Sequence, residues 1–265
     1  MLENEHCKSG LAANFYGTAG HKMTVRERFA SAAKQVFVQP VILEMTPPKE
    51  VLDLLRELEA KGYANPVAFG GALRDAYLIE NGISQPSDAG DIDIALRAAG
   101  ADEYFDAHEF NPSTWFMLNA SFASHTAEAL IENIEGITAT SLEKADTYKD
   151  FDACIEADYK ADGQDVRKLD LCFSDKVYTT EDLSLSGDAP INCIAMDSKG
   201  NVYAHPDFKQ HAERLLYKNI DPSNNSQRAE ERFNSLSQKI PGLVSADKPV
   251  SRIRRAIGQL TGLDL

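Results

Sequence analysis

Two carboxylates placed one residue apart follow a glycine turn in this chain, and together they suggest phosphate chemistry. The turn is Gly70-Gly71, and the acids are Asp91 and Asp93. Side chains alternate between the faces of a strand, so a strand through Ile92 places both acids on one side. Neighbouring carboxylates repel each other unless a divalent cation lies beside them, and Mg²⁺ prefers carboxylates together with substrate phosphates. The pair therefore predicts a Mg²⁺ site for a nucleotide.

The glycine turn supplies the other half of such a site. Glycines let the backbone approach an anion closely, and a helix that begins there presents unpaired N–H groups and the positive end of its dipole. Arg74 lies about one turn along that helix, within reach of a phosphate, whereas we expect Asp75 to orient a neighbour. Either feature alone is typical of an ordinary turn or of a solvated strand end. Their combination in this order favours a triphosphate site.

The same residues resemble the head domain of the template-independent nucleotidyltransferases, the family of CCA-adding enzymes and bacterial poly(A) polymerases. The family signature is Gly-Gly-x-x-Arg-Asp followed by an Asp-x-Asp strand. Here it is matched by Gly70, Gly71, Arg74, Asp75, Asp91 and Asp93. Ile191–Asp197 with Gly200–Tyr203 is similar to the family's later hairpin, and Arg214 lies where the family has a basic residue. The resemblance covers residues 64 to 218.

The resemblance implies an α+β fold, a polymerase-β-like nucleotidyltransferase head in which helices flank a small mixed sheet, followed by a short C-terminal helical region. The interval between Gly71 and Asp91 is longer than is usual in the family, which predicts an inserted loop at Asn81–Asp88 beside the site. Leu96 replaces the family's Thr. Arg228, Arg232 and Phe233 are faintly similar to the arginine-rich helix that reads the nucleotide in CCA-adding enzymes, with the spacing changed by one residue.

A two-metal mechanism needs a third carboxylate on a neighbouring strand. In Val166–Phe173 the apolar residues alternate with Asp170 and Cys172, which places Asp170 on the face opposite the core. Glu156 and Asp158 in the preceding alternating run compete for the role, although they also fit the solvated face of an edge strand. Strand pattern and resemblance both favour Asp170, which a hairpin across Asp162-Gly163 would carry toward the Asp-x-Asp strand.

The rest of the chain predicts three regions: an N-terminal arm and helix over residues 1–45, the head over 46–218 and a C-terminal helical region over 219–265. The clearest helix begins at Thr46 as its cap, with Pro47 in the first turn, and stops at Gly62. Its apolar stripe is Val51, Leu54, Leu55 and Leu58. Further helices are predicted at Thr24–Phe37, Ser124–Ile134 and Gln227–Ile240, the last ended by Pro241-Gly242.

Composition is that of an ordinary core-forming protein, with 43% apolar residues in 265. No apolar run approaches the ~20 residues of a membrane helix, and no basic region leads into an apolar one at the N-terminus, so we expect a cytoplasmic protein without a membrane partner. Four cysteines without Cys-x-x-Cys spacing indicate neither a disulfide framework nor a zinc site, and three are expected to fill the core. Trp115 is expected to lie in the core, and the scattered histidines are expected to be structural or exposed.

A net charge of −14 argues against a general nucleic-acid binder, because such affinity depends on Lys and Arg. One dense basic segment, Lys248–Arg255, is an exception. It could contact a polynucleotide, or it could belong to a C-terminal helix whose basic side is simply solvated.

These observations predict a metal-dependent nucleotidyltransferase. Gly70, Gly71 and Arg74 would hold the triphosphate of ATP or CTP, and Asp91, Asp93 and Asp170 would be the catalytic carboxylates that bind Mg²⁺. An acceptor hydroxyl would attack the α-phosphorus and release pyrophosphate. The resemblance implies the 3′ end of tRNA or another RNA as the acceptor. The short stretch after the head favours a reduced enzyme over one that carries out full CCA synthesis. Two alternatives remain: transfer to a small molecule or protein, and a catalytically idle nucleotide-binding regulatory protein.

Overall fold

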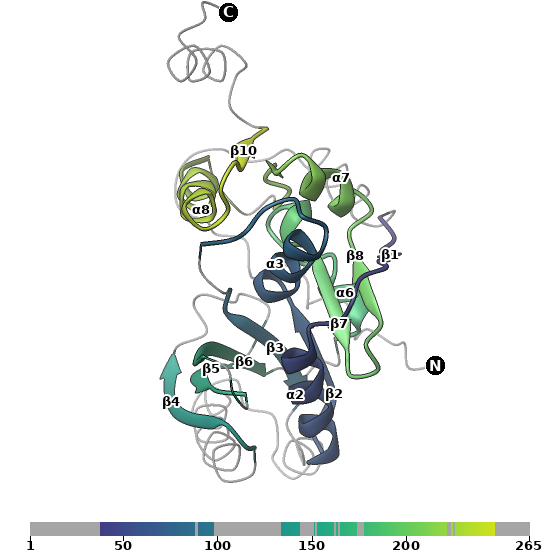
Figure 1. The fold of residues 1–265 in the computed structure, drawn as a ribbon, viewed down its shortest axis with the longest axis vertical. Coiled ribbons are helices and arrows are strands. Elements are labelled where there is room, and N and C mark those ends of the chain that lie inside the picture. Colours follow the sequence, from purple (N-terminus) through teal and green to yellow (C-terminus); the bar gives the residue numbers. More distant parts are fainter. Residues whose placement is uncertain are drawn as a thin grey trace, which may run out of the picture. The chain divides into compact units, whose positions relative to one another are not determined.

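Alternating apolar residues build a mixed β-sheet, which is the framework of the described part of the chain (Figure 1). The computed structural model describes residues 38–246 apart from 88–89, 98–133, 144–150, 152, 162, 164, 174–177, 222–223 and 225. The predicted helices Thr24–Phe37 and Ser124–Ile134, Trp115, the basic segment Lys248–Arg255 and the arm at residues 1–22 lie outside the described residues, apart from Ile134.

The strands in chain order are β1 (Val41–Ile42), β2 (Ala64–Phe69), β3 (Ile92–Arg97), β4 (Ile137–Glu143), β5 (Ala153–Tyr159), β6 (Arg167–Phe173), β7 (Ile194–Asp197), β8 (Val202–Ala204), β9 (Leu216–Tyr217) and β10 (Val244–Ser245). The helices are α2 (Lys49–Ala60), α3 (Gly71–Glu80), α6 (Thr180–Leu183), α7 (Phe208–Glu213) and α8 (Ser226–Lys239), with a 3₁₀ turn at Pro190–Asn192.

Within the described residues, eight strands form one sheet in the order β1-β8-β7-β2-β3-β6-β5-β4. All neighbours are antiparallel except β3 and β6, which run parallel at the centre. The short strands β9 and β10 pair separately, in parallel. The predicted α+β class is therefore confirmed, with a sheet wider than the small one expected. The predicted region boundaries at residues 45 and 218 stay predictions.

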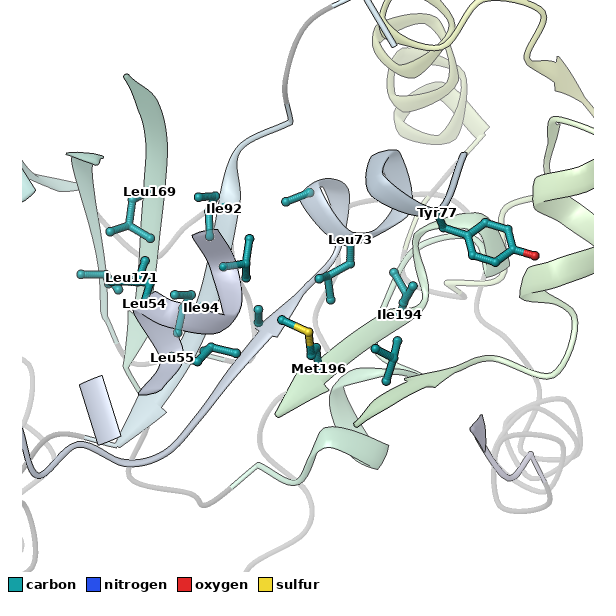
Figure 2. Close-up of a cluster of buried hydrophobic side chains, with 14 of the residues drawn as sticks. Leu54, Leu55, Leu73, Tyr77, Ile92, Ile94, Leu169, Leu171, Ile194 and Met196 are labelled. Atoms are coloured by element: carbon teal, nitrogen blue, oxygen red, sulfur yellow. The ribbon is translucent and has the colours of Figure 1, made fainter. Parts of the chain in front are cut away.

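One face of the sheet carries the main core, and helices α2 and α3 cover it. Figure 2 shows apolar side chains of both helices pointing toward those of β3, β6 and β7. The predicted stripe of α2 is completely buried, as are the alternate residues Ile92 and Ile94 of β3. The ring of Tyr77 on α3 meets Phe208 of α7 edge-on, with centroids 5.1 Å apart. These contacts fix where the first turn of α3 lies relative to β3.

The start of α2 differs from the prediction. Thr46 does not cap the helix, whose N-cap is Pro48 with extended backbone. A residue before proline is biased away from helical geometry, so the pair Pro47-Pro48 delays the helix to Lys49. Thr46 instead ties the chain to the end of α3, because its hydroxyl donates to Oε1 of Glu80 at 2.6 Å.

The two predicted hairpins are confirmed. β5 and β6 pair antiparallel around Gly163, whose φ is +71°, and β7 and β8 pair antiparallel around Gly200. Residues Pro190–Asn192 form a 3₁₀ turn rather than the beginning of the β7 strand. The helix predicted at Gln227–Ile240 is α8, and Gly242 follows it with a φ of +87°.

The expected small core fillers are also confirmed. Cys154, Cys172 and Cys193 are buried, and burial raises the pKa of the Cys193 thiol to about 12. His205 and His211 are buried as well, and burial lowers the pKa of each imidazole. No helix among the described residues is long and apolar enough to cross a bilayer.

Candidate functional site

Three acidic residues lie in a row across the face of the sheet opposite the main core. Asp93 on β3 stands directly beside Asp170 on β6, and Asp170 stands directly beside Glu156 on β5. Residues paired in register share a face, so all three carboxylates leave the sheet on the same side. Asp93 and Asp170 are half-buried. The structure thus places two of the three predicted catalytic acids on adjacent strands.

Asp91, the third predicted acid, lies just before the first residue of β3 and is exposed. Its carboxylate is 3.9 Å from the ammonium nitrogen of Lys239, the last residue of α8. Asp91 therefore stands at the mouth of the site, while Asp93 and Asp170 stand further along their strands.

The competing acids Glu156 and Asp158 have a cation of their own. The ammonium group of Lys168 lies 3.3 Å from Glu156 and 2.8 Å from Asp158. Hydrogen bonds to Asp158 and Glu156 raise the pKa of Lys168. Glu156 is also one strand further from Asp93 than Asp170 is, and each strand adds about 4.8 Å. The register therefore favours Asp170 as the partner of Asp93.

The glycine turn faces Asp93. Gly70 follows β2, is the N-cap of α3 and has a φ of +77° with a ψ of −133°, a conformation that is open essentially to glycine alone. Its amide donates to the carbonyl of Ile194 at 3.0 Å, which holds the turn against β7. A Cβ on Gly70 would stand 3.0 Å from Oδ2 of Asp93. The absence of a side chain at this position therefore lets the Asp93 carboxylate lie against the backbone of the turn.

Gly90 makes a second close approach that the motif did not predict. A Cβ there would lie 2.7 Å from Oδ2 of Asp75 and 3.1 Å from the carbonyl carbon of Gly71. The carbonyl of Gly90 also accepts a hydrogen bond from Arg167, whose guanidinium binds Glu50 of α2 at 3.0 Å. The segment leading to Asp91 is thus packed directly onto the first turn of α3.

Arg74 is buried beneath the turn, with 3% of its surface exposed. Its guanidinium donates to Oδ1 of Asp75 at 2.7 Å and to Oδ1 of Asn192 at 2.7 Å. Asn192 in turn donates to Asp188 at 2.7 Å. Arg74 also lines the cleft described below. Its bonds to Asp75 and Asn192 connect α3 to the 3₁₀ turn, and we call this connection the Arg74 bracket. Direct phosphate binding by Arg74 stays a prediction.

Asp75 orients its neighbour Arg74, as the sequence suggested. Its second oxygen, Oδ2, is buried without a hydrogen-bond partner among the described residues. Burial raises the pKa of Asp75, and the adjacent Arg74 opposes that rise. Asp75 therefore depends on Arg74 to stay charged inside the protein.

We expect Arg74→Met to destabilise the fold by about 3–5 kcal/mol at pH 8, because Asp75 then becomes an unpaired buried charge. The folded-state pKa of Asp75 already exceeds its unfolded value and rises further in this variant. For a carboxyl group with a raised folded pKa, stability is greatest below the unfolded pKa and falls as pH rises through the folded pKa. The deficit relative to wild type should therefore shrink toward pH 4. Urea unfolding at both pH values measures it, and a pH-independent deficit would contradict this account.

Asp93 borders a cleft of about 550 Å³, whereas Asp170 and Glu156 are not among the residues that line it. One wall is the glycine turn with Asp91 and Asp93, and the opposite wall is a single face of α8. The residues of that α8 face are Arg228, Glu231, Arg232, Ser235, Leu236 and Lys239. Leu236 is buried and anchors the helix, so the polar members face the cleft. The volume suits a nucleotide-sized ligand.

Arg228 and Arg232, noted from the sequence, both line the cleft, whereas Phe233 packs on Tyr217 with ring centroids 5.8 Å apart. Arg232 binds Asp188 at 3.3 Å. Asp188 also accepts from Tyr217 and Asn192, so it joins α8 to the bracket around Arg74. The sequence reasoning missed Asp188, although it lies only three residues before the Ile191–Asp197 match.

Two other noted residues lie away from the cleft. Leu96 is buried in the main core, and Arg214 is exposed after α7. The inserted loop is described over residues 81–87, and it reaches α8: the amide of Ser87 donates to the carbonyl of Lys239 at 2.9 Å.

The donor set fits Mg²⁺ in one specific way. No three acidic, histidine or cysteine side chains among the described residues are positioned as a ready-made metal cage. Mg²⁺ is usually held by one or two carboxylates completed by substrate phosphates and water. Asp93 and Asp170 provide such a pair beside an anion-binding helix N-terminus. The arrangement therefore fits a metal that arrives with its nucleotide.

No family model and no curated protein matches the chain. Its fold is similar to that of several solved enzymes. A tRNA-processing enzyme (apo form I) has a TM-score of 0.46 at 13% identity, over 82% of this chain and 49% of that one. The Bacillus stearothermophilus CCA-adding enzyme in complex with CTP has a TM-score of 0.42 at 18% identity, over 83% of this chain and 46% of that one. The Thermotoga maritima CCA-adding enzyme in complex with tRNA has a TM-score of 0.43 at 17% identity, over 82% of this chain and 44% of that one.

This chain spans less than half the length of those structures, since it covers 44–49% of each. At such identities and TM-scores the likeness concerns the fold alone. The functional proposal therefore rests on the geometry of the site.

Proposed function

We propose that the protein is a metal-dependent nucleotidyltransferase that transfers a nucleoside monophosphate from ATP or CTP to an acceptor hydroxyl. The observation that carries the proposal is the register pair Asp93–Asp170 beside the glycine turn, with Asp93 lining a nucleotide-sized cleft. An adjacent pair of half-buried carboxylates is unfavourable by itself, because like charges repel. A bound cation removes that cost.

From the order of groups across the sheet we infer that the two substrates would lie on opposite sides of Asp93. Gly70 lies on the β2 side and Asp170 on the β6 side. The triphosphate would lie over the turn, where its oxygens would accept hydrogen bonds from the backbone N–H groups in the first turn of α3. The acceptor hydroxyl would approach from the side of Asp170, whose carboxylate would take its proton. Attack on the α-phosphorus would then be in line with departure of pyrophosphate.

Asp91, Asp93 and Asp170 would hold Mg²⁺, with Asp91 reaching it from the mouth of the site. When bound, Mg²⁺ neutralises phosphate charge and aligns the attacking and leaving oxygens. The chain's own residues position these groups. Gly70 admits the Asp93 carboxylate to the turn, and the Arg74 bracket holds the start of α3. Positioning and charge neutralisation supply most of the rate enhancement in phosphoryl-type transfer.

RNA is the acceptor we propose first. Solved enzymes of similar fold have been determined with CTP, ATP and tRNA, so these are the first compounds to test. The acids Glu156 and Asp158 beyond Asp170, together with the net charge of −14, favour a second candidate, an uncharged small-molecule or protein acceptor. Lys168 neutralises only part of this charge, so a polyanion approaching along β5 would still meet net negative charge there.

Incubation with α-labelled ATP or CTP, Mg²⁺ and total RNA tests the proposal. Label fixed to RNA supports the first acceptor, and label fixed to protein or to a small molecule supports the second. Binding of Mg·NTP by calorimetry without transfer to any of these acceptors would favour an idle regulatory protein. Absence of both binding and transfer would refute the proposal.

A further inference from the structure

Lys239 places a positive charge at the mouth of the cleft, opposite the glycine turn. Its ammonium nitrogen is 3.9 Å from Oδ2 of Asp91, and 38% of its side chain is exposed. It borders the same cleft as Gly70, Gly71 and Asp93. Its charge also acts on Asp75 beneath the turn, whose pKa it lowers. No motif in the sequence marks this residue.

The end of α8 that carries Lys239 is held in place from its backbone. The amide of Ser87 donates to the Lys239 carbonyl at 2.9 Å, and the Ser87 hydroxyl donates to the Gln238 carbonyl at 3.2 Å. Ser84 makes a further bond, of 3.4 Å, to the carbonyl of Pro241. These bonds come from the inserted loop after α3. The loop therefore fixes the position of the Lys239 backbone. These bonds do not hold the Lys239 side chain, which can change its ion-pair partner.

The contact between Lys239 and Asp91 is weak. The two side chains are 38% and 49% exposed, and the separation is at the long limit of an ion pair. Such exposed pairs contribute at most about 1 kcal/mol. Arg74 and Arg232, by contrast, are engaged by hydrogen bonds to Asn192 and Asp188. Of these three cations, Lys239 has the contact that is easiest to exchange.

We propose that Lys239 is a phosphate-binding residue that exchanges partners: it pairs with Asp91 in the empty cleft and with the triphosphate when Mg·NTP binds. The inference rests on the proposed function, which it extends by naming the cation that receives the nucleotide's tail. A triphosphate between the turn and α8 lies close to this ammonium group. Its arrival replaces a long ion pair with charge-assisted hydrogen bonds to phosphate oxygens and frees Asp91 for the metal.

Lys239→Gln should therefore change two affinities in opposite directions. The KM for Mg·ATP or Mg·CTP should rise about 10-fold or more, with kcat nearly unchanged, because a hydrogen bond to a charged group is lost. Without nucleotide, Mn²⁺ alone should bind the full-length protein up to about 5-fold more tightly by calorimetry, because Asp91 loses its competing cation. A purely structural role for Lys239 would not tighten Mn²⁺ binding.

Lys61→Gln is the matched control, since Lys61 is also a cation at the C-terminal end of a helix and does not border the cleft. It should leave both affinities unchanged, and Lys239→Arg should restore most of the nucleotide affinity. Unchanged nucleotide and Mn²⁺ affinities in a well-folded Lys239→Gln protein would overturn this inference alone. If the wild-type protein itself binds no Mg·NTP, the proposed function falls with it.

Discussion

Asp93→Asn and Asp170→Asn should each reduce nucleotide transfer by at least about 10²-fold, with little change in stability. Removing one preorganised charged or polar group from a reaction centre typically costs 10²–10³-fold. Both carboxylates are half-buried neighbours on parallel strands, and the replacement keeps their shape. Removing one of two adjacent negative charges also relieves the repulsion between them. Steady-state transfer of labelled NMP and a thermal unfolding curve measure the two quantities.

Glu156→Gln is the control for this pair of variants. Glu156 lies in the same row, on the far side of Asp170, and is paired with Lys168. Loss of the Glu156 carboxylate should change the transfer rate by less than about 10-fold. Ten-fold is the lower end of the effect that is typical for residues contacting a metal's ligands. Larger damage from Glu156→Gln than from Asp170→Asn would reassign the third carboxylate to β5. Full activity of Asp93→Asn would remove the basis of the proposed enzyme.

Gly70→Ala should impair both the fold and the activity, for two separable reasons. The backbone of Gly70, with φ of +77° and ψ of −133°, excludes side chains at a cost of about 1–3 kcal/mol. The new Cβ would also stand 3.0 Å from Oδ2 of Asp93 and push the carboxylate aside. A displacement of even about 1 Å in a reacting group costs up to 10²-fold in rate. We therefore expect a lower melting temperature and a loss of transfer on the order of 10²-fold.

Gly82→Ala separates strain from displacement. Gly82 has a φ of +63°, and a Cβ there would meet nothing within 4 Å. The variant should lose about 1 kcal/mol of stability, the cost of left-handed backbone, and keep its transfer activity. If both variants lose stability alone, the contact between Gly70 and Asp93 has no catalytic importance. Titration of Mn²⁺ into Gly70→Ala then shows directly whether the Asp93 carboxylate has moved.

Local pattern was enough to predict most elements near the site. Alternation marked the β5–β6 hairpin and placed Asp170 opposite the main core, and the stripe of α2 is buried as expected. These properties depend on periodicity and on the conformational limits of glycine and proline, which act over a few residues. The prediction failed at Thr46, where two successive prolines outweighed a favourable cap residue.

Long-range contacts in the site were not accessible in the same way. The bracket that joins Arg74 to Asn192 spans 118 residues, and the ion pair between Arg232 and Asp188 spans 44. Neither shows in any local spacing, because both depend on how the 3₁₀ turn packs against α3 and α8. The sequence predicted Arg74 as a phosphate contact, which stays a prediction, but it did not predict its buried bond to Asn192.

The sequence alone determined the chemical inventory: a glycine turn opening a helix, an Asp-x-Asp strand and a third acid on an alternating strand. Only the tertiary structure showed that Asp170, and not Glu156, lies in register directly beside Asp93, because the parallel pairing of β3 with β6 is a contact between segments far apart in the chain. It also decided that α8 and Lys239 face the turn across a cleft. The physical reason is the distance along the chain over which each effect acts. Backbone preferences act between residues that are neighbours in sequence, whereas burial of the shared core determines which distant strands pair.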